Sequence, residues 1–193
     1  MTGPRVIACS VFPRDVGSPR HDLVRAFRAG DEPAFAAVAA LVINGLAREA
    51  PELDRAAGVV AVPMPGHRTA TCSAPLERLA ALLASDHPGW SAMPGALNRV
   101  ENAPEGKAGG PRDPAAEAAT LRWSKVPGKG PVLLLDDVMR SGATLDAAAL
   151  AAPPAIRARL VALVAFRAVA SSRAGSRPAL VPRVPAGPTG PPS

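Results

Sequence analysis

The sequence predicts an α/β domain built around a mostly parallel sheet, and three observations favour this fold class. Short apolar runs alternate along the chain with longer segments that carry apolar residues at helical spacing. Parallel neighbouring strands need such crossover helices between them. With 193 residues, 48% of them hydrophobic, the chain is long enough for one domain with a sizeable core.

The first half of the chain predicts strands and helices in turn. Residues 5 to 12 predict a short strand, and residues 21 to 28 predict a helix. A longer helix is expected over residues 33 to 50, because a proline stands near its start and apolar residues recur on one face. Residues 58 to 63 predict an apolar strand, and residues 73 to 85 predict a helix with leucines at helical spacing.

The second half continues this pattern. Strands are expected near residues 97 to 102, 131 to 136 and 159 to 167, all in the parallel sheet with the strand at 58 to 63. Residues 104 to 114 predict a loop rich in glycine and proline. Residues 115 to 123 predict a short helix, and a further helix is expected after the strand that ends near 136.

The predicted domain covers residues 1 to 170, with lead-in helices over about 1 to 57 and the core over about 58 to 170. Residues 171 to 193 are rich in Pro, Ser, Gly and Arg and contain no acidic or aromatic residue. Such a segment cannot bury enough apolar surface to offset the entropy of ordering it. It predicts a disordered, proline-rich tail.

The composition limits the partners. A formal net charge of +6 favours anionic partners such as phosphates or nucleic acid, whereas 3% aromatic residues make stacking readout of single strands unfavourable. Cys9 and Cys72 show neither a disulfide framework nor metal-ligand spacing, and no signal-peptide pattern opens the chain, so a cytoplasmic protein is expected. Apolar segments fall short of the ~20 residues that span a bilayer, so no membrane contact is expected.

The most informative stretch is VLLLDDVMRSGAT, residues 132 to 144. An apolar strand leads into Asp136 and Asp137, and ligands of parallel sheets bind at the carboxyl ends of strands. Residues 141 to 144 follow where a helix should begin, so backbone N–H groups and hydroxyls suit a phosphate. Two carboxylates can accept hydrogen bonds from a vicinal diol. The combination predicts a ribose phosphate site, and the plainer alternative is a buried strand with an acidic turn.

This stretch resembles the PRPP-binding motif of the type I phosphoribosyltransferases, where PRPP is 5-phosphoribosyl 1-diphosphate. The resemblance implies the fold of that family, Mg²⁺ as cofactor and a homodimer. It also implies that Asp136 and Asp137 hold the ribose hydroxyls and contact the metal indirectly. The loop around the 5′-phosphate would be Arg140, Ser141, Gly142, Ala143 and Thr144. Where Arg140 stands, the family usually has Thr, or Asp in purine-base enzymes, so a purine-type proton-transfer carboxylate is missing.

Two further stretches are similar to the ComF-like branch of that family. Residues 59 to 84, VVAVPMPGHRTATCSAPLERLAALLA, resemble its first strand, pyrophosphate loop and helix, and residues 23 to 47 resemble its lead-in helices. The resemblance implies a pyrophosphate loop of Pro65, Gly66, His67 and Arg68. The chain departs from that branch in lacking a cysteine-rich metal module and in reading TATCSAP after this loop.

Residues 97 to 114 fall where the family carries its mobile catalytic hood. On such a loop Arg99, Lys107 and Arg112 would neutralise the leaving pyrophosphate. A solvated linker with incidental charges is nearly as well supported. Elsewhere, His21 and His87 are expected to face solvent, and Trp90 and Trp123 to pack in the core.

Two function classes are open at this point. The first, which is preferred, is a phosphoribosyltransferase that transfers phosphoribose from PRPP to an unidentified nitrogen acceptor and releases pyrophosphate. The second is a non-catalytic PRPP sensor or a DNA-uptake or other nucleic-acid-associated protein on the same fold. The net positive charge of the chain is compatible with this second class.

Overall fold

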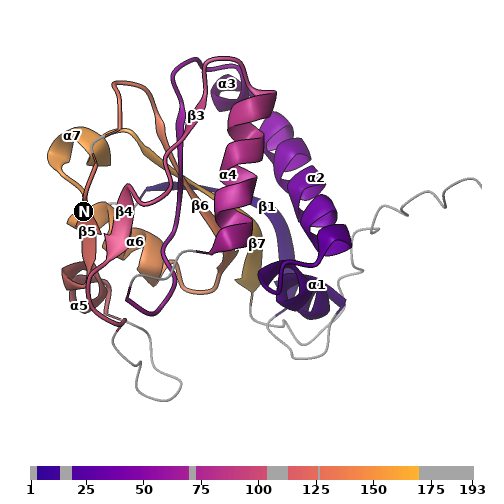
Figure 1. Cartoon of the computed structure of the whole chain (residues 1–193), viewed down its shortest axis with the longest axis horizontal. Helices are drawn as coiled ribbons and strands as arrows, with labels where there is room; N and C mark the ends of the chain where they lie inside the picture. The colour runs from indigo at the N-terminus through magenta and orange to yellow at the C-terminus, as the bar shows by residue number, and fades with distance from the viewer. Residues whose placement is uncertain (1–3, 14–18, 70–72, 104–112, 126, 170–193) are drawn as a thin grey trace, which may run out of the picture.

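The computed structural model describes residues 4–13, 19–69, 73–103, 113–125 and 127–169. Figure 1 shows the elements. In chain order they are β1 (Arg5–Pro13), α1 (Pro19–Arg28), α2 (Glu32–Glu49), α3 (Pro51–Asp54), β2 (Val60–Pro63), α4 (Ala74–Asp86), β3 (Ser91–Ala92), β4 (Leu97–Arg99), α5 (Pro114–Ala119), β5 (Leu121–Trp123), β6 (Val132–Met139), α6 (Ala143–Ala151), α7 (Pro154–Arg157) and β7 (Leu160–Val169).

The main sheet of the described residues has five strands in the order β1-β7-β6-β2-β3. All neighbouring strands in it run parallel, which confirms the predicted α/β fold with a mostly parallel sheet. The strands β2 and β6 are apolar at successive positions because helices cover both faces of the sheet.

Two apolar cores lie on opposite faces of this sheet. Leu133 and Leu135 point into the core with α1, α2 and α4, whereas Val132 and Leu134 point into the core with α6 and α7. This alternation follows from the two-residue period of a strand. In Figure 1 the helices α1, α2 and α4 accordingly stand on one side of the sheet and α5, α6 and α7 on the other.

The strand expected near residues 97 to 102 exists, but its place in the parallel sheet was predicted wrongly. It is the short strand β4, which pairs antiparallel with β5 in a separate two-stranded sheet. The expected helix at 115 to 123 is also too long, because α5 ends at Ala119 and Leu121 begins β5. Strands of three residues carry too little pattern to identify their partner.

The strand β6 continues further than its apolar run indicated. It pairs with β7 as far as Met139 and Arg167, so Asp136 and Asp137 lie within the strand rather than after it. Val138 packs toward the α2 side, the same side as Asp137, and Met139 packs toward the α6 side, so the strict alternation is interrupted after Asp137. Two acids near the end of a strand do not end it when apolar residues follow.

The side chain of His87 is only 12% exposed and is held by two protein groups, so the prediction that it faces solvent was wrong. Its Nδ1 lies 2.8 Å from the carbonyl oxygen of Leu83 and its Nε2 lies 2.9 Å from Asp54 Oδ1. The ring also stacks on Trp90, with 4.4 Å between centroids. Trp90 is buried, as expected, and Trp123 packs against the α6 core. Among the described residues no helix is both long and apolar enough to cross a membrane.

Candidate functional site

The candidate site lies at the edge of the sheet where the chain leaves the neighbouring strands β2 and β6 in opposite directions. From β2 the chain passes through α4 to β3, and from β6 it passes through α6 and α7 to β7, in the opposite direction along the sheet. The helices α4 and α6 therefore cover opposite faces, although β2 and β6 are neighbours. Open α/β sheets bind ligands in the crevice at such a switch point. The sequence motif identified the strand end, but only the strand order identifies the switch.

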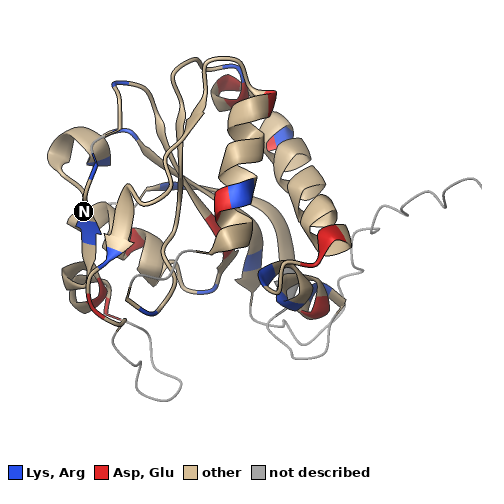
Figure 2. Ribbon diagram, in the orientation of Figure 1, with Lys and Arg blue, Asp and Glu red and all other residues tan. Residues whose placement is uncertain are grey.

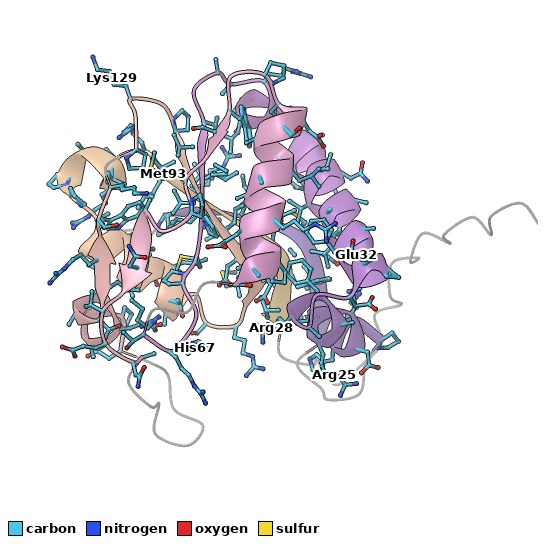
Figure 3. All side chains as sticks on the ribbon, viewed as in Figure 1. Arg25, Arg28, Glu32, His67, Met93 and Lys129 are labelled. Atoms are coloured by element: carbon cyan, nitrogen blue, oxygen red, sulfur yellow. The ribbon has the colours of Figure 1, made fainter. Side chains whose placement is uncertain are left out.

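The loops after β2 and β6 lie side by side at this edge. The last bond between the two strands runs from the Met64 N–H to the Leu135 carbonyl, at 2.9 Å. In Figure 3 His67, from the first loop, and Arg28, from α1, lie at the same lower edge of the molecule, whereas Lys129 lies at the opposite edge. Figure 2 shows basic residues on α1 and on the loops at this lower edge.

The two acids are neighbours in β6 and point to opposite faces of the sheet. Strand alternation directs Asp136 toward the side of α5 and α6, and Asp137 toward the side of α1. Asp137 is buried, with 5% exposure, whereas Asp136 is partly exposed. Asp136 Oδ1 also accepts a hydrogen bond from the Asp137 N–H at 2.9 Å.

The environment of Asp136 favours its neutral form. Burial, and after it the negative charge of Asp137, raise the pKa of its carboxyl to about 7. The Asp137 N–H and the positive charge of Arg28 act against this rise. The pair therefore holds less than two full negative charges near neutral pH.

Asp137 is bound by Arg28, a contact that the sequence did not predict. The guanidinium is bidentate: Nε donates to Oδ2, and Nη2 donates to Oδ1 at 2.7 Å. The hydrogen bond with Asp137 raises the pKa of Arg28. Arg28 ends α1, which rests on α2 through the stacked rings of Phe27 and Phe35, 6.2 Å apart. A basic residue in the last turn of a helix is common for dipole reasons, so no sequence signal indicated this partner.

The loop after β6 leads into α6 through a left-handed residue. Gly142 is the N-cap of α6, with φ 84° and ψ −6°, a conformation that favours glycine. The Ala143 N–H donates to Ser141 Oγ at 3.3 Å. Arg140 and Ser141 are exposed, whereas Ala143 is buried and Thr144 partly buried. The first N–H groups of α6 thus face this edge beside the acids.

The loop after β2 runs along the segment that follows β4. The Ala103 N–H donates to the His67 carbonyl at 2.8 Å, and the Thr69 N–H donates to Asn102 Oδ1 at 2.9 Å. Pro65 is buried, Gly66 is partly buried, and His67 and Arg68 are exposed. Two of the four predicted pyrophosphate-loop residues thus reach the surface at the switch point.

The residues predicted for the catalytic hood are placed differently. Arg99 belongs to β4 and is 2% exposed, so its predicted position on a mobile loop was wrong. Lys107 and Arg112 lie outside the described residues, as does the predicted tail at 171 to 193. No group of three or more metal-ligating side chains occurs in the described part of the chain.

Comparisons with known proteins add no family to this description. No protein-family model matches the chain, and searches of curated proteins and of solved structures found no match either.

Proposed function

We propose that the protein binds PRPP at the switch point between β2 and β6 and transfers its phosphoribosyl group to a nitrogen acceptor, with release of pyrophosphate. One observation carries this proposal. Two loops suited to phosphate groups flank an acidic pair at the switch point of the sheet, which is where open α/β sheets bind ligands. A ribose with a phosphate at one end and a diphosphate at the other matches this arrangement of two loops around an acidic pair.

Each part of the ligand has a counterpart. Residues 140 to 144 bind the 5′-phosphate through the N–H groups at the start of α6. Asp136 and Asp137 accept hydrogen bonds from the ribose hydroxyls. Since the two carboxylates point to opposite faces, the ribose lies across the end of β6. Residues 65 to 68 bind the pyrophosphate, with the Arg68 charge close to it.

Mg²⁺ fits the donor set of this site. Carboxylate oxygens are ligands that Mg²⁺ prefers, and it is commonly held by one or two carboxylates together with phosphate oxygens of a substrate. Asp136 and Asp137 would contact it indirectly, and the phosphate oxygens of the substrate would be its direct ligands. When bound, the ion neutralises charge on the departing pyrophosphate.

The ribose competes with Arg28 in this scheme. Both oxygens of Asp137 accept from the guanidinium in the ligand-free protein. A hydroxyl that uses Asp137 therefore replaces or rearranges that ion pair. The half-exposed side chain of Arg28 can move toward solvent, and the ribose hydroxyl then supplies a donor to the buried Asp137.

Pyrophosphate release tests the proposed reaction. Incubating the protein with PRPP, Mg²⁺ and a panel of nucleobases and amines should release pyrophosphate with at least one acceptor. PRPP binding with no release from any acceptor contradicts the transfer step. If salt-dependent affinity for DNA accompanies that result, the non-catalytic alternative replaces it.

A further inference from the structure

A buried arginine is tied to the loop after β2. The Arg99 side chain has 0% exposure, and its Nε donates to the Gly66 carbonyl at 2.7 Å. Its two other donor nitrogens bind Thr120 Oγ1 at 2.5 Å and Glu117 Oε1 at 3.1 Å. Such an enclosed guanidinium is not in position to contact a ligand. It can act only through the groups that it holds.

The hydrogen bond from Arg99 to the Gly66 carbonyl determines how the peptide between Gly66 and His67 is oriented. The Gly66–His67 peptide is trans, and in a trans peptide the carbonyl and the N–H point in opposite directions. Arg99 draws the Gly66 carbonyl inward, so the His67 N–H is directed away from the buried network. The Ala103 N–H holds the next carbonyl, that of His67, and turns the Arg68 N–H in the same manner. Successive N–H groups that face one side form a concave anion site.

The bond from Arg99 is the stronger of the two constraints. Its donor is charged, and charged donors bind carbonyls more strongly than neutral ones. It is also enclosed, whereas residues 67 to 69 are exposed. Glu117 and Thr120 hold the guanidinium from α5 and its C-terminal end, so the loop after β2 is anchored on an element from another part of the chain.

We infer that Arg99 is a positioning residue for diphosphate recognition: it holds the Gly66 carbonyl and thereby directs the N–H groups of the loop after β2 toward a bound pyrophosphate group. This inference rests on the proposed function. It assigns Arg99 a role in binding the pyrophosphate of PRPP and none in binding the ribose or its 5′-phosphate, which lie at β6.

Two variants test the inference. Glu117→Gln removes the ion pair but leaves a side-chain oxygen for Arg99, so the tie to Gly66 stays. The double change Arg99→Met with Glu117→Gln removes the tie and leaves no buried charge alone. Affinities for pyrophosphate and for ribose 5-phosphate, each with Mg²⁺, are measured by calorimetry for both variants and the wild type, and thermal melts confirm that each is folded.

The double variant should bind pyrophosphate about tenfold more weakly than Glu117→Gln, while the two bind ribose 5-phosphate equally. Equal pyrophosphate affinities in the two variants contradict the inference alone. So does a similar loss for both ligands, which indicates general loosening of the fold. If the wild type binds neither ligand, the proposed function fails, and this inference fails with it.

Discussion

The ionisation of Asp136 makes the stability of the folded protein depend on pH. The carboxyl of Asp136 has a pKa near 7 in the folded protein, against about 3.9 in an unfolded chain. Between these values the folded state holds a proton that the unfolded state has released. Stability therefore falls as pH rises from about 4 to about 7. Above pH 7 the folded protein carries the full cost of the ionised Asp136.

The first prediction follows from this fall in stability with rising pH. Asp136→Asn removes the ionisation, so at pH 8 it should raise the free energy of unfolding by about 1–3 kcal/mol, with little effect at pH 4. Urea unfolding across this pH range measures the effect. Asp86→Asn, at an exposed position in α4, is the matched control and should leave the pH profile unchanged. Identical profiles for Asp136→Asn and the wild type would show that the carboxyl titrates normally.

The helix α1 is connected to the edge of the sheet by the ion pair between Arg28 and Asp137 of β6. Arg28→Met leaves the buried Asp137 without its partner and should lower the free energy of unfolding by about 1–2 kcal/mol, a value reduced by the exposure of the guanidinium. The same change should tighten binding of ribose 5-phosphate, because no ion pair has to be displaced. Calorimetry and chemical unfolding measure the two effects.

Arg25→Met is the matched control for α1. Its side chain is 83% exposed and pairs with Asp22 of the same helix. That change should affect neither stability nor ligand affinity by a measurable amount. If the Arg25 and Arg28 variants behave alike, the contact with Asp137 does not control access to the acidic pair.

The turn before β6 gives a prediction about packing alone. A Cβ on Gly130 would lie 2.0 Å from the Gly58 carbonyl oxygen, whereas a Cβ on Gly128 meets no atom within 4 Å. Gly130→Ala should therefore destabilise the protein by about 2 kcal/mol or more, because backbone must move, and Gly128→Ala should change stability by less than about 0.5 kcal/mol. Thermal melts of the two variants decide. Equal effects would mean that the backbones at Gly58 and Gly130 do not approach each other this closely.

For the whole molecule, the fold class and the main strands were predictable because long apolar runs with helices between them leave few alternatives. The strand at 131 to 136 and its acidic pair were found for that reason. The partner of β4 was not, since three residues carry no information about which sheet they join. Pairing depends on contacts between distant segments, which a single sequence does not display.

The same limit applies to the site. The switch point depends on strand order, and the Arg28–Asp137 pair joins residues that are 109 positions apart. The burial of Arg99 likewise depends on Glu117 and Thr120, which follow it by 18 and 21 positions. Local motifs located the acids and the two loops, and tertiary structure supplied the residues that hold them.

In the proposed function the acidic pair of β6 binds the ribose of PRPP. Thermal melts with PRPP and Mg²⁺ test it most directly, using the wild type and the Asp136→Asn, Asp137→Asn double variant. PRPP should raise the melting temperature of the wild type by mass action. In the double variant this rise should nearly vanish, because each lost charged hydrogen bond weakens binding by about 1.5–3 kcal/mol.

Without ligand the double variant should melt near the wild type, since losing the Arg28 pair offsets the removed repulsion between the acids. If PRPP does not change the melting temperature of the wild type, the protein does not bind PRPP and the proposed function is wrong. A double variant that melts much earlier yet keeps the full PRPP shift would also contradict the proposed function, because the acids would then serve the fold and not the ligand.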